Sequence, residues 1–397
     1  MLARVVCSKN NLFFAFLVLS YVFGVVLYDY LSVFSSDEVM ALFLLFFTGM
    51  VVNERRCFRE VIPLCVVAGI FLFYTLYSVI IGSNVLVAIL KDLLIEIKPF
   101  LGFFCTYAIM PTLSPLQKRS LVIMCLVVAA LLLFIGIMND VVVYFGHPAC
   151  FAKTIVATAF LYLYCCSDEW PDFIGFLLIL TVGLFSTRAK FYGFWGVAFL
   201  LVFLYKAGIR IKFDFKSIIL LLCVGALAVW LGRDKLIMYY VDGMLDSREM
   251  WSRPAILLTS LKLFVDYAPL GSGLASFASY ASGEYYSHIY EDYGINHLWG
   301  ISREFYSFVA DAYYPMLAQF GIVGLGLYIF FWIWMVRKGR AMRKQGFAKE
   351  ELLILLATVF FAIEGVADST FSQNRGLFVL IVAAMALTKG KEHAKAE

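Results

Sequence analysis

The sequence predicts an all-α, polytopic integral membrane protein. Of its 397 residues, 63% are hydrophobic and only 15% are charged, and the mean hydropathy is +0.88. A soluble globular domain does not have this composition. Apolar runs recur along the chain, and because the hydrocarbon core holds no water, each run must satisfy its backbone as a helix. One long polar stretch, residues 233–312, interrupts the pattern.

The apolar runs give about twelve transmembrane helices, each suited to about 30 Å of hydrocarbon. These runs are residues 12–31, 38–53, 61–82, 92–111, 120–138, 150–166, 173–187, 190–206, 216–232, 313–336, 351–366 and 376–388. We expect residues 1–397 to form a single transmembrane domain, with residues 233–312 as one large loop within it. Ordinary connections have about 2–8 residues, so we expect this loop to fold on the membrane surface and form part of a site.

Positive charge is concentrated in alternate connections. Arg55, Arg56 and Arg59 lie in one of them, and residues 337–344 form another basic connection. The large loop belongs to the other, more acidic set, and the acidic segment 167–172 is an exception on the basic side. By the positive-inside rule, both termini are cytoplasmic and the large loop is external. In a Gram-negative bacterium the chain would lie in the inner membrane, with the loop in the periplasm.

No cofactor or metal site is expected from the motifs. The four histidines lack the spacing of metal ligands, and the large loop contains no cysteine. Phosphate-binding loops, dinucleotide fingerprints and nucleophile elbows are also absent from the sequence. We therefore expect no cofactor and no nucleic-acid partner, and the driving energy must come with the substrate or from an ion gradient.

The loop contains one segment with the pattern of an amphipathic helix. Leu257, Leu261 and Phe264 recur at helical spacing, opposite polar side chains. We expect this helix to lie at the outer membrane–water interface. Arg248 and Arg253 are near its start, where backbone N–H groups add positive potential that favours an anion.

The apolar run 173–206 is broken only by residues 186–190, which include Arg188 and Lys190. An unbroken helix of this length would measure about 50 Å, more than a bilayer needs, so the chain must turn near Arg188. The turn falls on the external side, against the positive-inside bias. Arg188 should therefore have an anionic partner, and the alternative is a lipid-headgroup anchor.

Other charged residues are expected on the same membrane face. Lys98 lies near the external end of the fourth span, and Asp311 directly precedes the tenth. Asp368 and Arg375 fall in the last external connection. Because charge within or beside membrane spans usually marks a site, we treat these residues as candidates. Lys98 could instead be an interfacial residue, and Asp311 a solvated helix cap.

Four short motifs occur in order along this face. They are STRAK at 186–190, the pair Arg248 and Trp251, APLGSGLASF at 268–277 and DAYYPMLAQFGIVGLGLY at 311–328. In this order and sidedness, the chain resembles the Wzy-type O-antigen and exopolysaccharide polymerases and the related O-antigen ligases. The resemblance covers the whole chain in topology and only these motifs in residue detail.

The resemblance implies a glycosyltransferase whose donor is an undecaprenyl-pyrophosphate-linked glycan, held at its pyrophosphate by Arg188 and Arg248. Guanidinium groups bind phosphate oxygens as a fork and stabilise the leaving group without a metal. Asp311 stands where the ligases carry His, which favours a polymerase. It is then either the base for the acceptor hydroxyl or a residue that orients it. Further substrate-binding candidates are Arg253, Lys98, Lys190, Asp368, Arg375 and Tyr313.

Partners implied by the resemblance are membrane lipids, a chain-length regulator and a flippase. Loop tyrosines such as Tyr280 and Tyr290 suit either a carbohydrate path or an interfacial aromatic belt. The rival functions are an O-antigen ligase that transfers glycan to lipid A-core, and a transporter of polysaccharide or lipid-linked sugar. Transporters usually show related halves, and the sequence shows no convincing internal repeat.

Overall fold

The computed structural model describes the chain except for residues 1, 32–35, 56–57, 210–236, 239–249 and 397. Every regular element in this described part is helical. Seven of its helical stretches are long and apolar enough to cross a membrane. The fold is therefore that of a helical, multi-pass membrane protein, as the composition predicts.

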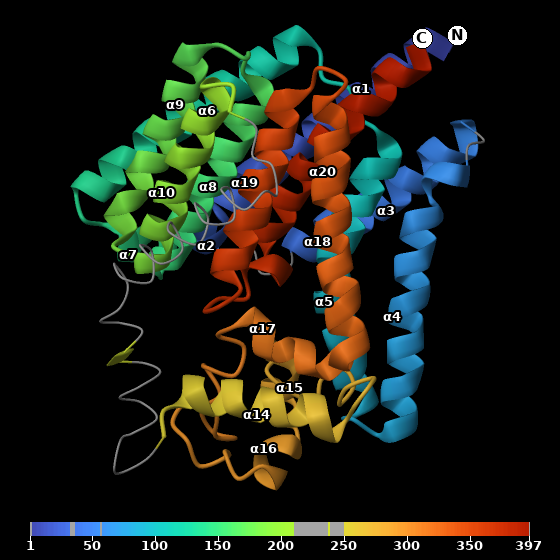
Figure 1. Ribbon diagram of the computed structural model, residues 1–397, viewed down its shortest axis with the longest axis vertical. Coiled ribbons are helices and arrows are strands. Elements are labelled where there is room, and N and C mark those ends of the chain that lie inside the picture. Colours follow the sequence, from blue (N-terminus) through green and yellow to red (C-terminus); the bar gives the residue numbers. More distant parts are fainter. Residues whose placement is uncertain (1, 32–35, 56–57, 210–236, 239–249, 397) are drawn as a thin grey trace.

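The helices form one bundle with a smaller layer at one end (Figure 1). The first part of the chain contributes α1 (Leu2–Tyr21), η1 (Val22–Val26), α2 (Tyr28–Leu31), α3 (Ser36–Arg55), η2 (Phe58–Glu60), α4 (Ile62–Ile81), α5 (Leu86–Ile109), α6 (Pro115–Ile137), α7 (Val141–Phe145), α8 (Pro148–Cys165), α9 (Trp170–Val182), η3 (Gly183–Ser186) and α10 (Ala189–Lys206). The last part adds α18 (Gly321–Arg343), α19 (Ala348–Glu364), η6 (Thr370–Ser372) and α20 (Asn374–Ala396). Helix α8 is at the centre, because it packs on α6, α9 and α20 and is buried almost throughout.

Helices occupy eleven of the twelve ranges predicted as spans, and the remaining range, 216–232, lies outside the described residues. Several of these helices are less apolar than a simple span. Helix α5 contains Lys91, Asp92, Glu96 and Lys98, and α19 has only 17 residues. The count of twelve crossings is therefore not established by the structure.

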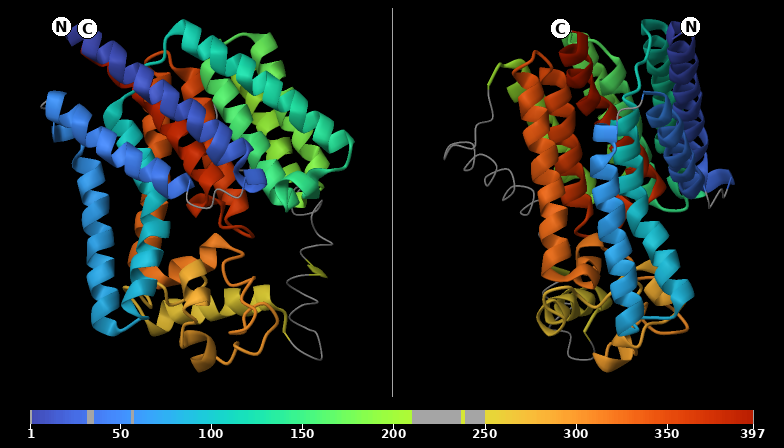
Figure 2. Two further views of the ribbon diagram at one scale, coloured as in Figure 1. Left: turned by 180° about the vertical axis from the view of Figure 1, so that it is seen from behind. Right: turned by 90° about the vertical axis from the view of Figure 1, so that its right-hand side faces the viewer.

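The loop segment, described here from residue 250 to 312, lies at one end of the bundle. It contains α14 (Ser252–Asp266), α15 (Tyr280–Glu284) and α16 (Ile289–Asp292), and α17 (Tyr313–Met316) and η5 (Leu317–Phe320) lead from it into α18. Figures 1 and 2 show α4, α5 and α18 reaching toward this segment beyond the other helices. The outer ends of α1 and α20 lie at the opposite end of the bundle.

Helix α14 is the helix predicted within the loop. Its buried side includes Ile256, Thr259 and Leu263, whereas Leu261 and Val265 are 55% and 75% exposed. The side that packs on the protein therefore lies away from Leu261, one of the apolar residues expected at the membrane interface. The exposed leucine and valine leave an apolar strip that suits a membrane interface.

Two glycines bring the loop segment into backbone contact with the start of α18. Gly271 and Gly321 have φ values of +87° and +60°, which L side chains rarely adopt. A Cβ atom on Gly271 would lie 2.3 Å from the backbone nitrogen of Gly321. Beside them, the Gly273 N–H donates to the Gln319 carbonyl at 2.9 Å. On α5, the buried Asp92 accepts the Ala275 N–H at 2.6 Å. These contacts fix the loop segment against α5 and α18.

We predict that Gly271→Ala destabilises the protein. The added methyl group meets backbone atoms that cannot move aside, and its φ is unfavourable, so the cost should reach about 1–3 kcal/mol or more. Thermal unfolding in detergent would show this as a lower Tm. Gly196→Ala is the matched control, because Gly196 is in α10 with open space around its Cβ position and Ala favours a helix. Equal Tm values for the two variants would contradict the contact.

Candidate functional site

Three connections meet at the end of the bundle that faces the loop segment: the residues before α8, the turn between α9 and α10, and the α19–α20 connection. In the second, η3 ends α9, Thr187 is left-handed with φ +53°, and Arg188 is extended before α10 begins. The chain therefore turns at Arg188, which confirms the predicted break of the apolar run. Lys153 of α8, Arg188 and Lys190 at the start of α10, and Asp368 of the α19–α20 connection bring charge to this end.

Asp368 is at the centre of this charged cluster. Its carboxylate lies 3.2 Å from Lys153 Nζ and 3.4 Å from Lys190 Nζ, and it accepts the Thr370 hydroxyl at 2.9 Å. Lys190 also forms an ion pair of 2.6 Å with Glu364. Burial alone would raise the pKa of Asp368, but Lys153 and Lys190 outweigh it and hold the pKa well below the usual range. The carboxylate is therefore ionised at neutral pH.

His147 caps α8 and faces the same cluster. Its Nδ1 accepts the Ala149 N–H at 3.2 Å. Burial lowers the pKa of His147, and the positive charges of Arg188 and Lys153 lower it further, while Asp368 and Asp311 oppose this with smaller effects. His147 is thus a neutral imidazole at pH 7, close enough to these groups to sense their charge.

Arg188 is half-buried at the start of α10. Within the described part of the chain, no carboxylate forms an ion pair with it. Arg248, the other arginine predicted to hold an anion, lies outside the described residues, so the expected pairing of the two arginines remains a prediction. Lys190, two residues after Arg188, is committed to Glu364 and Asp368.

Asp311 and Arg253 form an ion pair beside the cluster. Asp311 Oδ2 lies 2.6 Å from Arg253 Nε and 2.5 Å from one terminal nitrogen of the same guanidinium. The two residues line a small cavity of about 140 Å³ with Tyr314 and Val366. The sequence analysis named Arg253 and Asp311 as separate candidates. In the structure their ion pair joins α14 to the segment that precedes α17.

The other three candidates lie outside this cluster or at its edge. Lys98 is buried in ion pairs with Asp37 at 2.5 Å and Glu38 at 3.0 Å, so it does not contribute charge to the cluster. Arg375 pairs with Asp29 at 2.5 Å and donates to the Thr154 hydroxyl. Tyr313 is buried and lines an apolar cavity.

Sequence reasoning missed Lys153, Glu364 and His147. Lys153 is a lone cation in the apolar run 150–166, and Glu364 is a lone carboxylate near the end of the run 351–366. Isolated charges within spans mark functional or structural sites, and that signal was available. His147 gave no such signal, because it precedes its helix and has no histidine nearby in sequence. The loop tyrosines divide: Tyr290 is buried with its hydroxyl bonded to the Ala278 N–H, whereas Tyr280 is 52% exposed.

The cluster can accept an anion. Among the described residues, four cations stand against three carboxylates: Lys153, Arg188, Lys190 and Arg253 against Asp311, Glu364 and Asp368. With His147 neutral, these described residues leave one positive charge over, and Arg188 is the cation that forms no ion pair with any of the three carboxylates. The cluster therefore combines a guanidinium open to an anion with a carboxylate and an imidazole that can accept protons.

In comparisons with known proteins, no protein-family model and no curated protein sequence matches this chain.

We predict that Asp368→Asn costs about 3–5 kcal/mol of stability, because Lys153 stays buried without its carboxylate, whereas Lys190 keeps its ion pair with Glu364. The measurement is thermal unfolding in detergent at several pH values. Since the folded-state pKa of Asp368 is lowered, its contribution is complete above the ordinary carboxyl pKa of about 4. This contribution is lost as the pH falls toward the folded-state pKa of Asp368. The difference in Tm between wild type and variant should therefore become smaller in acid.

The control is Asp168→Asn, because Asp168 also pairs with a lysine, Lys206, but is 54% exposed. An exposed pair of this kind contributes about 1 kcal/mol or less. Similar losses of stability in both variants would contradict a central role for Asp368.

Proposed function

We propose that the chain is an integral membrane glycosyltransferase that polymerises undecaprenyl-pyrophosphate-linked oligosaccharide repeat units into O-antigen or exopolysaccharide. The observation that carries this proposal is Arg188, a half-buried guanidinium with no carboxylate ion pair among the described residues. A cation beside membrane spans is costly without an anion, and a pyrophosphate supplies one. The motifs around Arg188 resemble those of the polymerase family.

In the proposed reaction, a hydroxyl at the non-reducing end of an incoming repeat unit attacks the anomeric carbon of the growing chain. The bond to the pyrophosphate oxygen breaks, the configuration inverts, and the hydroxyl proton passes to a base on the protein. We assign to both Arg188 and Arg248 the role of stabilising the negative charge that develops on the pyrophosphate. Because these guanidinium groups supply the positive charge, no divalent metal is required in this scheme.

Asp311 is the proposed base. Its carboxylate lines the small cavity beside the charged cluster and is held there by Arg253 of the loop segment. Asp368 suits this role less well, because Lys153 and Lys190 stabilise its ionised form and make it a weak base. His147 is the better second choice, since it is neutral at pH 7 and lies near Asp311 and Arg188.

The proposed topology places the cluster and the loop segment at the periplasmic face of the inner membrane, with both termini cytoplasmic and about twelve crossings. The distribution of Lys and Arg along the sequence supports this orientation. So does the position of the loop segment opposite the outer ends of α1 and α20 in Figure 2.

Purified protein supplied with lipid-linked repeat units tests the proposal directly. Longer glycans on the same lipid support a polymerase. Transfer of glycan to added lipid A-core would instead support an O-antigen ligase. Movement of the lipid-linked unit across a vesicle membrane, with no new glycosidic bond, would support a transporter and overturn both.

We predict that Arg188→Ala lowers the polymerisation rate by about 100-fold or more, because the leaving pyrophosphate loses its main cation. Arg188→Lys should restore only part of the rate, since an ammonium group lacks the two-pronged contact. Arg303→Ala serves as the control, because Arg303 is an exposed loop cation paired with Glu291. A normal rate for Arg188→Ala at normal protein level would remove Arg188 from the site.

We predict that Asp311→Asn lowers turnover by about 100-fold or more while donor binding stays within a few-fold of wild type, as expected for loss of a general base. Asp311→His should retain more activity than Asp311→Asn, because imidazole accepts a proton near neutral pH. If Asp311→Asn reacts at the normal rate, the base lies elsewhere. If it fails to bind donor, Asp311 orients substrate.

A further inference from the structure

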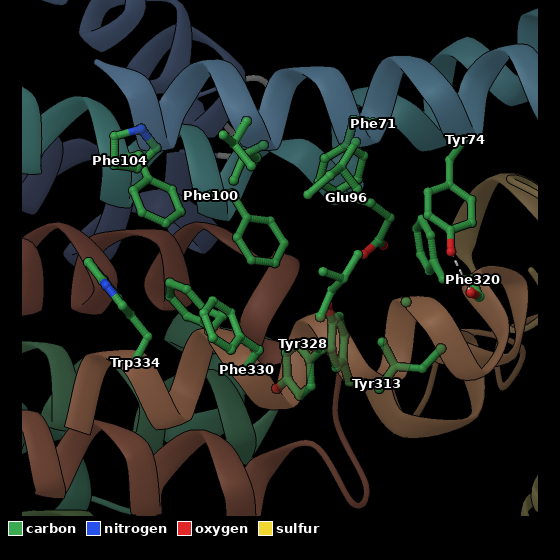
Figure 3. A pocket seen from close by; sticks show the side chains of 18 of the residues that line it. Phe71, Tyr74, Glu96, Phe100, Phe104, Tyr313, Phe320, Tyr328, Phe330 and Trp334 are labelled. Atoms are coloured by element: carbon green, nitrogen blue, oxygen red, sulfur yellow. Dashed lines mark hydrogen bonds between the residues drawn. The ribbon is translucent and has the colours of Figure 1, made fainter. Parts of the chain in front are cut away.

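A second site lies away from the charged cluster, in a cavity of about 350 Å³ among α4, α5, η5 and α18 (Figure 3). This volume is within the range of small-molecule sites. Ten of the nineteen described residues that line it are aromatic, and they include Phe71, Phe100, Tyr313 and Tyr328. Glu96 is the one charged residue among them. The cavity is therefore an aromatic box with a single carboxyl group.

Glu96 lacks a partner that would explain its burial. It is 3% exposed, and its Oε2 atom makes no hydrogen bond within the described structure. Lys98, the nearest cation in sequence, is occupied by Asp37 and Glu38 of α3. Figure 3 shows the Glu96 side chain pointing into the space between the aromatic rings. An orphan carboxyl group of this kind within a membrane helix marks a functional site.

The cavity reaches the outer surface of the bundle between α4 and α18. Three residues that line it, Val66, Leu327 and Phe330, are 55%, 38% and 62% exposed. The surface around this opening is apolar, so the route into the cavity is from lipid. A ligand that enters this way must carry an apolar body.

We propose that this cavity binds a lipophilic organic cation, a free amine or quaternary ammonium group on an apolar body. The faces of the aromatic rings attract such a cation, and Glu96 supplies the opposite charge. The apolar body occupies the remainder of the cavity and its opening. This inference is independent of the proposed glycosyl transfer, because it uses none of the residues assigned to pyrophosphate binding or proton transfer. Tyr313, a substrate-binding candidate from the sequence, lines this cavity instead.

Other ligand classes fit the lining less well. A neutral chain leaves the Glu96 oxygen without a partner, and an anion finds no cation among the described residues that line the cavity. A metal ion requires several oxygen ligands, whereas this lining offers one carboxyl group and tyrosine hydroxyls. A phospholipid headgroup brings its phosphate beside its ammonium group, and no cation lines the cavity among the described residues to accept that phosphate.

The test is native mass spectrometry of the full-length protein in a neutral maltoside detergent, with probes that share a dodecyl chain. Dodecyltrimethylammonium carries only the cation, dodecylphosphocholine adds a phosphate, and dodecanol is uncharged. We expect one dodecyltrimethylammonium to bind per protein, at least tenfold more tightly than either other probe. Equal binding of dodecanol would show a merely apolar cavity, and equal binding of dodecylphosphocholine would indicate a lipid-headgroup site. Either result overturns the proposal.

Glu96→Gln should weaken the binding of dodecyltrimethylammonium at least tenfold and leave the binding of dodecanol unchanged. Glu284→Gln is the matched control, because Glu284 is a loop carboxylate paired with Lys91 and should bind as wild type. Phe100→Leu keeps an apolar lining but removes an aromatic ring. It should therefore weaken the binding of the cation about fivefold and leave the binding of dodecanol unchanged. This second variant tests the site even if Glu96→Gln fails to fold. Unchanged cation binding in either folded variant overturns the proposal.

Discussion

Charges buried among the helices are held by partners from distant parts of the chain, and the arrangement of the bundle depends on these pairs. Asp368 bonds Lys153 of α8 and Lys190 of α10, so it joins two helices to the α19–α20 connection. Lys98 joins α5 to α3 in the same way through Asp37. Because an uncompensated buried charge costs several kcal/mol, none of these helices can shift alone. The residues that interrupt the apolar pattern are thus the ones that set helix positions.

Two residues close to the start of α17, one before it and one in it, belong to different environments. Asp311 pairs with Arg253 at the edge of the charged cluster, whereas Tyr313 is buried and lines the aromatic cavity. The backbone of this segment is tied to the bundle, because the N–H groups of Tyr313 and Tyr314 both donate to the Gly365 carbonyl. Gly365 in turn lies three residues before Asp368. A short piece of chain therefore separates the charged cluster from the aromatic cavity and is attached to both.

The sequence predicts the elements of this fold better than their contacts. Apolar runs locate the helices because hydrocarbon requires helical backbone, and the turn at Arg188 follows from length alone. The partners of the charged side chains could not be predicted in this way. Lys98 was expected to face an external cavity, but Asp37 and Glu38, about sixty residues earlier, hold it instead. The pair of Arg253 and Asp311 spans 58 residues and leaves no local pattern.

The charged cluster shows the same division between local pattern and distant contact. Arg188 and Asp368 were identified because each lies in a polar break between apolar runs. Lys153 was passed over because a single lysine inside an apolar run does not alter its hydropathy, and its partners are 215 and 220 residues away. Periodicity reports which side of a helix is apolar. It does not report which distant residue a buried charge will meet.

The backbone contact between Gly271 and Gly321 has a mechanical consequence. Side chains usually separate the main chains of two packed segments, but here the two main chains are in direct contact with no side chain between them. The loop segment cannot be pressed closer to α18, and the hydrogen bonds on either side resist its being drawn away. Because Asp92 of α5 also holds Ala275, rotation about this point is resisted as well. The spacing between the loop segment and α18 is therefore set by backbone geometry and not by the size of any side chain.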